Sequence, residues 1–215
     1  MTFGLGELND VRAINVFAEC IDTIELDIKS ESNQFHVMIP AFGSHLAALA
    51  PAAVIVGRLL GLTDEDICRG FMSYSPVEGR SVVSKPNGLT IIDDCYNANP
   101  NSVKAALTSI SALSGRRVAI LGDMFNLGEH SEQMHFDVGK FAAQSGIDLL
   151  ICQGELARMI YEGFLSAGGK DVYYYPLMDE LMSEIPGKIK KGDTVLVKAS
   201  RGMHFEKLLP LLTEL

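Results

Sequence analysis

The sequence predicts an α/β protein in which residues 77–215 form a mainly parallel, doubly wound sheet, preceded by a smaller region of β-hairpin and helices at residues 1–76. From Arg80 onward, short apolar segments rich in β-branched residues alternate with helical patterns. That alternation is typical of parallel sheets with helices on both faces. Polar residues follow most of these segments, as expected where parallel strands end at a shared ligand-binding edge.

In the first region, two segments with alternating apolar residues predict an antiparallel hairpin. Ile24, Leu26 and Ile28 share one face of TIELDIK, and the same alternation recurs in QFHVMIP at residues 34–40. Residues 30–33 are polar and supply the turn between the two segments. These elements lack a complete sheet of their own.

Two helices are expected after the hairpin. The stretch from Gly43 to Leu60 is rich in Ala and Leu, and Thr63 is a suitable N-cap for a second helix with acids at positions 64–66. The helix signals stop near Ser75-Pro76. We therefore place the domain boundary between residues 76 and 77.

Five strands are expected in the second region. They are Leu89–Asp93, Arg117–Leu121, Leu149–Cys152, Val172–Tyr175 and Thr194–Val197. In right-handed strand-helix-strand units the carboxyl ends of the strands share one edge of the sheet. The segments DDCYNAN (93–99), GDMFNLGE (122–129), QGE (153–155) and KASRG (198–202) follow four of these strands. The sequence thus predicts a rim of polar residues capable of ligand binding.

The most informative of these segments is IIDDCYNANPNS at residues 91–102. Its apolar strand stops at two acids, and Asn99-Pro100 supplies an N-cap and a first-turn proline for the next helix. An acid at this place in an α/β sheet commonly binds the hydroxyls of a ribose. The alternative is a polar loop whose Asp and Asn side chains only satisfy turn and cap groups.

The segment after the last strand is a candidate anion site. Lys198, Ser200 and Arg201 offer a point charge, a hydroxyl and a bidentate guanidinium before a helix start. The alternative is a solvated strand exit.

Cysteine and histidine chemistry has less support. The four cysteines form no C-x-x-C pair, which argues against zinc and a disulfide framework and is compatible with a reducing cytoplasm. A nucleophilic Cys95 is disfavoured because neighbouring acids raise the pKa of a thiol. His130 and His135 are five residues apart, a spacing that does not place both on one helical face.

Composition excludes several classes of function. The net charge of −9 and the pI near 5.0 argue against nucleic acid or an anionic membrane as the main partner. The longest apolar stretch, residues 46–62, is interrupted by Pro51 and Arg58, so no membrane span is expected. Neither G-x-G-x-x-G nor G-x-x-x-x-G-K-[ST] occurs, so another segment must hold the phosphates of any bound nucleotide. Met1 is followed at once by a strand-like pattern, which suggests a piece of a longer protein.

Four motifs in this order carry a family resemblance. DDCYNANPNS (93–102), preceded by PVEGR (76–80) and followed by LGDMFNLGEHS (121–131) and DTVLVKASRGMHFE (193–206), resembles the Mur ligases. Such enzymes have a UDP-sugar domain, a central ATPase domain with the P-loop, and a Rossmann-like carboxyl-terminal domain. The resemblance implies that residues 1–76 are the carboxyl-terminal end of the central domain and that residues 77–215 are the whole third domain.

The resemblance also implies an activity. It is ATP-driven amide formation in peptidoglycan precursor synthesis in the bacterial cytoplasm, joining D-Ala-D-Ala to UDP-N-acetylmuramoyl-tripeptide through an acyl phosphate. ATP and Mg²⁺ are the implied cofactors, and the remaining domains of the same enzyme are the implied partners. Because the P-loop and the magnesium ligands are expected outside this chain, the chain alone is expected to be inactive.

Roles for single residues follow from the matched motifs. Arg80 and Lys198 are implied to be catalytic, with Arg80 reaching the γ-phosphate and the acyl phosphate. The implied ATP-binding residues are Arg80, Asp94 at the ribose, Tyr96, Asn97, Asn99 and His45. The implied substrate-binding residues are Asp123, Met124, Glu129, Ser200 and Arg201. Where many Mur ligases have asparagines after the matched histidine, this chain has Leu46 and Leu49, and Ala199 replaces a frequent glycine.

Two other functions stay open. One is a free-standing, non-catalytic α/β module that binds a nucleotide or a protein partner. The other is a small oxidoreductase, which the missing glycine fingerprint disfavours.

Overall fold

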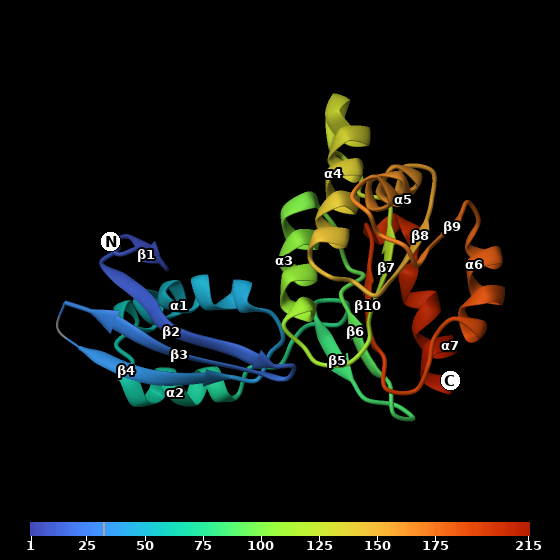
Figure 1. Cartoon of the computed structure of the whole chain (residues 1–215). Helices are drawn as coiled ribbons and strands as arrows, with labels where there is room; N and C mark the ends of the chain where they lie inside the picture. The colour runs from blue at the N-terminus through green and yellow to red at the C-terminus, as the bar shows by residue number, and fades with distance from the viewer. Residues whose placement is uncertain (32) are drawn as a thin grey trace. The chain divides into compact units, whose positions relative to one another are not determined.

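The computed structural model describes residues 1–31 and 33–215, and of residue 19 only the backbone. The chain divides into two compact units, Met1–Pro76 and Val77–Leu215. Each unit is described by itself (Figure 1).

The first unit contains a four-stranded sheet in the order β1-β2-β3-β4. The strands are β1 (Phe3–Gly4), β2 (Val11–Cys20), β3 (Thr23–Ser30) and β4 (Gln34–Ile39). The antiparallel pairing of β3 with β4 confirms the predicted hairpin, although residue 32 of the expected turn lies outside the described residues. The expectation that this region lacks a sheet of its own was wrong. Strand β2 has register shifts after Ile14 and Phe17, and Asn15 has a φ of 51°, so β2 lacks the regular alternation that marks a strand.

A short 3₁₀ turn, η1 (Ser44–Ala48), and two helices, α1 (Ala50–Leu59) and α2 (Asp64–Met72), complete the first unit. The expected Ala/Leu helix is therefore interrupted, and α1 starts with a proline in its first turn. The predicted N-cap is confirmed, because Thr63 and Asp66 form a reciprocal capping box. Ala50 and Val54 of α1 and Ile67 of α2 pack on the sheet residues.

The second unit is a six-stranded sheet in the order β5-β6-β10-β7-β8-β9. Its strands are β5 (Val82–Ser84), β6 (Thr90–Asp93), β7 (Arg117–Gly122), β8 (Leu149–Gln153), β9 (Val172–Tyr175) and β10 (Thr194–Lys198). All neighbours are parallel except β5 and β6. This confirms the doubly wound α/β prediction and all five expected strands. The three-residue edge strand β5 was not predicted.

Helices cover both faces of this sheet (Figure 1). One side carries α3 (Pro100–Ser111), α4 (Ser131–Gln144) and α5 (Ala157–Ser166). The other side carries α6 (Met178–Glu184) and α7 (Leu208–Glu214), whose Leu181, Leu208 and Leu212 are fully buried against the strands. Four 3₁₀ turns lie between these elements: η2 (Gly128–His130), η3 (Ile185–Gly187), η4 (Arg201–Met203) and η5 (Phe205–Lys207). The carboxyl ends of five parallel strands are left to form one rim.

Candidate functional site

The two acids at the end of β6 hold the loop that carries Arg80. One oxygen of the buried Asp93 accepts a hydrogen bond from the Gly79 N–H at 3.1 Å. The other accepts from the N–H of Cys95 at 3.2 Å and from its thiol at 2.8 Å. Burial and this bond to Asp93 raise the pKa of the Cys95 thiol, so the sulfur stays protonated and is no nucleophile.

Asp94 connects the same loop to β10. Its Oδ1 accepts from Ser81 N–H at 3.1 Å and from the Ser81 hydroxyl at 3.3 Å. Its Oδ2 accepts from the Lys198 ammonium at 2.6 Å, and Lys198 also donates to the carbonyl of Asn97 at 3.0 Å. A carboxylate has about four acceptor positions, so Asp94 keeps some capacity for a further donor.

The predicted anion clamp at the end of β10 is only partly seen. Lys198 and Ser200 are 2% and 3% exposed, whereas Arg201 is exposed. The interpretation of Lys198 as an open anion ligand is not supported, because its ammonium lies beside the β6 loop and needs the Asp94 charge to be stable there. Of this trio, Arg201 alone faces solvent.

The Arg80 loop has an uncommon backbone. Gly79 and Ser81, on either side of Arg80, have φ angles of 73° and 55°. A Cβ at Gly79 would lie 3.1 Å from Tyr96 N, which itself donates to the Gly79 carbonyl at 2.9 Å. Ser81 is thus a non-glycine residue in the left-handed region, and such residues cluster at functional sites.

The exposed ring of Tyr96 stacks against two arginines. The guanidinium carbon of Arg80 lies 4.1 Å from the ring centroid, and that of Arg201 lies 4.9 Å from it. Within the part of the chain that the structure describes, neither guanidinium has an acidic partner. Two unpaired guanidiniums on one ring can bind an anion such as phosphate or carboxylate.

The two asparagines of the motif satisfy local backbone groups. Asn97 accepts from the N–H of Ala98 at 2.9 Å. Asn99 caps α3 in a reciprocal box with Ser102, which confirms the predicted N-cap. For these two exposed side chains, the turn-and-cap interpretation describes what the structure shows.

A buried polar network forms the floor of the rim. Asp123 accepts from the N–H of Ala157, at the start of α5, at 2.7 Å. Its carbonyl accepts from Ser200 N–H at 3.0 Å, and the Ser200 hydroxyl accepts from Phe125 N–H at 2.8 Å. Burial raises the pKa of the Asp123 carboxyl. Met124 is fully buried, so of the GDMFNLGE residues predicted to bind substrate only Glu129 is exposed.

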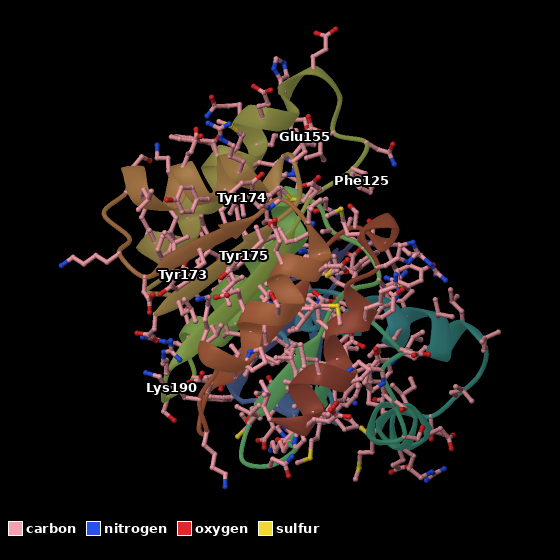
Figure 2. The ribbon with its side chains drawn as sticks, turned by 90° about the vertical axis from the view of Figure 1, so that its right-hand side faces the viewer. Phe125, Glu155, Tyr173, Tyr174, Tyr175 and Lys190 are labelled. Atoms are coloured by element: carbon pink, nitrogen blue, oxygen red, sulfur yellow. The ribbon has the colours of Figure 1, made fainter. Side chains whose placement is uncertain are left out.

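His135 is a structural residue that sequence reasoning did not assign to the site. Its Nε2 accepts from Met124 N–H at 2.8 Å, and its Nδ1 donates to the Ser131 carbonyl at 2.7 Å. Burial lowers the pKa of the ring, which stays neutral and fixes the loop after β7. The only sequence signal for this structural role is the position of His135 one turn into α4, four residues after Ser131. Figure 2 shows Phe125 and Glu155 toward this end of the sheet.

His45 belongs to the first unit. It lies in η1 and is exposed, and its ring packs over Gly43, where an added Cβ would lie 2.5 Å from it. Gly43 has a φ of 105°, so this turn requires glycine.

No three His, Cys, Asp or Glu side chains in residues 1–31 and 33–215 are grouped to hold a metal ion. Among these residues, no helix has the length and apolar character required to cross a bilayer.

Known sequences that are similar to this chain are Mur ligases. The family model described as "Mur ligase, glutamate ligase domain" matches residues 79–201. The UDP-N-acetylmuramoyl-tripeptide--D-alanyl-D-alanine ligase of Bacillus subtilis is 34% identical over 217 residues, covering 99% of this chain and 47% of that protein. The ligase of the same name from Treponema pallidum is 38% identical over 182 residues, covering 82% of this chain and 39% of that protein. The chain thus spans less than half the length of these relatives.

Solved structures agree. MurF from Acinetobacter baumannii superposes with a TM-score of 0.88 at 28% identity, covering 98% of this chain and 46% of that one. The MurF ligase of Thermotoga maritima in complex with ADP shares the fold. It has 23% identity and a TM-score of 0.81, covering 97% of this chain and 47% of that one.

Proposed function

This chain belongs to the Mur ligase family, and we propose that it forms part of an ATP-dependent ligase that joins D-Ala-D-Ala to UDP-N-acetylmuramoyl-tripeptide. The observation that carries the proposal is the fixed position of Arg80. The backbone N–H groups on both sides of it are held by Asp93 and Asp94, so its guanidinium is presented by a preorganised loop. The names of the relatives supply the substrates.

The reaction proceeds through an acyl phosphate. The tripeptide carboxylate attacks the γ-phosphorus of ATP, and ADP leaves. The amine of D-Ala-D-Ala then attacks the acyl carbonyl, which forms the amide and releases phosphate. Arg80 donates to the phosphoryl oxygens as charge develops, a task that suits a bidentate cation held in place.

The other rim residues have binding or positioning roles. Asp94 accepts from the ATP ribose with its remaining capacity, and Tyr96, Asn97 and Asn99 line the nucleotide side. Arg201 and Glu129 face the peptide substrates, while Asp123, Met124 and Ser200 shape the floor beneath them. Lys198 acts through Asp94, whose position it fixes.

Mg²⁺ is expected with ATP in such an enzyme. The described residues hold no cluster that fits the ion, so we assign no step to it and place its ligands in the part of the relatives that this chain does not span. We place the enzyme in the bacterial cytoplasm, where its nucleotide substrates occur and where the four free cysteines stay reduced.

A non-catalytic module is the second candidate. It is favoured by one observation: these 215 residues contain no P-loop motif. Such a module binds a nucleotide or a protein partner without turnover.

Product formation by the chain alone and by a fusion decides between the two. We expect the purified chain to release no phosphate from ATP in the presence of both peptide substrates, because it has no phosphate cradle. Fused behind the upstream part of the Bacillus subtilis ligase, it should form the D-Ala-D-Ala amide, detected by mass spectrometry. The same fusion with Arg80→Ala is the control for background activity.

Two outcomes contradict the proposal. One is amide formation by the chain alone. The other is a fusion that is folded by circular dichroism, binds ATP and yields no amide, which favours the non-catalytic module.

A further inference from the structure

Arg80 and Arg201 differ from the other arginines of the chain. Five of the eight arginines, Arg58, Arg69, Arg116, Arg117 and Arg158, form ion pairs with carboxylates. Arg12 donates to a backbone carbonyl. The guanidiniums of Arg80 and Arg201 instead contact an aromatic ring, and among the described residues neither forms an ion pair. In a chain with 27 acids and 18 basic residues, this lack of acidic partners keeps both guanidiniums available for an external anion.

The ring that these two arginines share is fixed by its own backbone. Tyr96 N–H donates to the Gly79 carbonyl at 2.9 Å, and Gly79 N–H donates to Asp93 at 3.1 Å. Arg201 follows directly after the buried Ser200, whose N–H is bonded to the Asp123 carbonyl at 3.0 Å. The backbone next to each arginine is therefore held by hydrogen bonds, and both guanidiniums contact the same Tyr96 ring.

The separation of the two guanidiniums suits one small anion. Their central carbons lie 4.1 and 4.9 Å from the same centroid, which limits their mutual distance to about 9 Å. A stacked guanidinium keeps its N–H groups in the plane of the fork, free to donate at the edge of the ring. With charge-assisted bonds of about 2.8 Å on each side, a phosphate-sized anion spans such a gap.

We propose that Tyr96 is a positioning residue that makes Arg80 and Arg201 a single site for a phosphoryl-type dianion. This assigns Arg201 to the same anion as Arg80 and gives the Tyr96 ring a role other than nucleotide contact. The identity of the dianion in the cell, a phosphoryl group in transit to the acyl acceptor, rests on the proposed function. The site itself does not.

Titration of inorganic phosphate into the 215-residue chain tests the site, with the arginine Nε–Hε signals followed by NMR. We expect the signals of Arg80 and Arg201 to shift together with one dissociation constant. Tyr96→Leu should weaken binding by about tenfold, since two stacked cations lose their platform. Tyr96→Phe keeps the ring and should stay within about twofold of the unaltered chain.

Tyr173 provides a matched control in the same unit. Tyr173 is 39% exposed, close to the 37% of Tyr96, and Lys188 Nζ lies 3.8 Å from the centroid of its ring. Tyr173→Leu should leave the phosphate affinity within about twofold. Melting temperatures of all variants show that each is folded before titration.

Three results overturn the proposal: separate dissociation constants for the two arginines, an unchanged affinity in folded Tyr96→Leu, or an equal loss in Tyr173→Leu. The titration needs neither ATP nor peptide. Its failure is therefore distinct from failure of the ligase assay, which depends on amide formation by the fusion.

Discussion

The arginines at the two ends of the second unit's sheet have different partners: carboxylates at one end and an aromatic ring at the other. At the amino ends of the strands, arginines are paired. Arg116 donates to Asp193 at 2.9 Å, and Arg117 contacts Asp148 at the same distance. At the carboxyl ends, Arg80 and Arg201 pack on the Tyr96 ring, and neither has a carboxylate partner among the residues that the structure describes. Figure 2 shows Lys190 toward the first end and Phe125 and Glu155 toward the second.

The two ends differ in whether their charged side chains are paired within the protein or remain exposed. A cavity of about 150 Å³ at the amino end is lined by Arg116, Asp171, Tyr173 and Lys188 among others. Arg116 contacts Asp171, and Lys188 contacts both Glu184 and the Tyr173 ring. The charges of these two cations are thus compensated within the protein. At the carboxyl end the buried Lys198 pairs with the partly buried Asp94, and among the described residues no carboxylate pairs with the exposed Arg80 or Arg201.

The largest expected effect on stability is at the amino end. Asp193 is 2% exposed and accepts from Arg116 and from Lys190 N–H at 2.9 and 2.8 Å. Asp193→Ala leaves both donors without their acceptor and should lower the free energy of unfolding by about 3 kcal/mol. Urea unfolding measures it, with exposed Asp179→Ala as the control. A loss no greater than that of the control removes the structural role from this end.

A smaller difference is expected between two matched arginines. Arg116→Gln loses bonds to Asp193 and to the Lys188 carbonyl and should cost about 2 kcal/mol. Arg80→Gln loses only a stack on an exposed ring and should cost under about 1 kcal/mol. Parallel denaturation of the two variants checks the order. If Arg80→Gln is the more destabilising, Arg80 stabilises the fold, which contradicts the proposed difference between the two ends of the sheet.

The smallest effect concerns the buried floor of the carboxyl end and depends on pH. Burial lowers the folded-state pKa of His135, so the unfolded chain binds more protons than the folded chain as pH falls below about 6.5. Stability should therefore fall in that window, by at most about 1.4 kcal/mol per pH unit. The raised pKa of Asp123 acts in the opposite direction, because the folded chain then holds the Asp123 proton more tightly than the unfolded chain.

A titration-free variant isolates the contribution of His135. In His135→Gln the dependence of unfolding free energy on pH should be flatter between pH values of about 6.5 and 5.5. The other four histidines are exposed and are the same in both proteins, so the comparison isolates His135. Equal slopes would falsify the neutral, buried state of His135.

Local patterns were sufficient to predict five of the six strands of the second unit, all but the short edge strand β5, and the N-caps Thr63 and Asn99. These features depend on residues close in sequence: apolar β-branched runs, a capping side chain and a first-turn proline. The polar rim was predicted on the same basis, because polar segments follow the strands.

Which rim residues face solvent was not predictable from local sequence. Lys198 pairs with Asp94, 104 residues away, and that contact turns an apparent anion ligand into a buried anchor. Ser200 and Met124 are buried through bonds to Phe125 and His135. Such pairing leaves no periodic signal, and the packing of Arg80 and Arg201 on the Tyr96 ring likewise joins residues from opposite ends of the second unit's sequence.

The most direct test of the account is the catalytic effect of Arg80→Lys in the ligase fusion at saturating ATP. Lysine keeps the charge and loses the guanidinium fork, so kcat should fall by roughly 10²-fold or more with the melting temperature unchanged. Arg158→Lys, at an exposed pair with Glu162, should leave kcat unaltered. A kcat for Arg80→Lys within about threefold of the parent fusion would contradict the claim that the unpaired arginine serves the phosphoryl group.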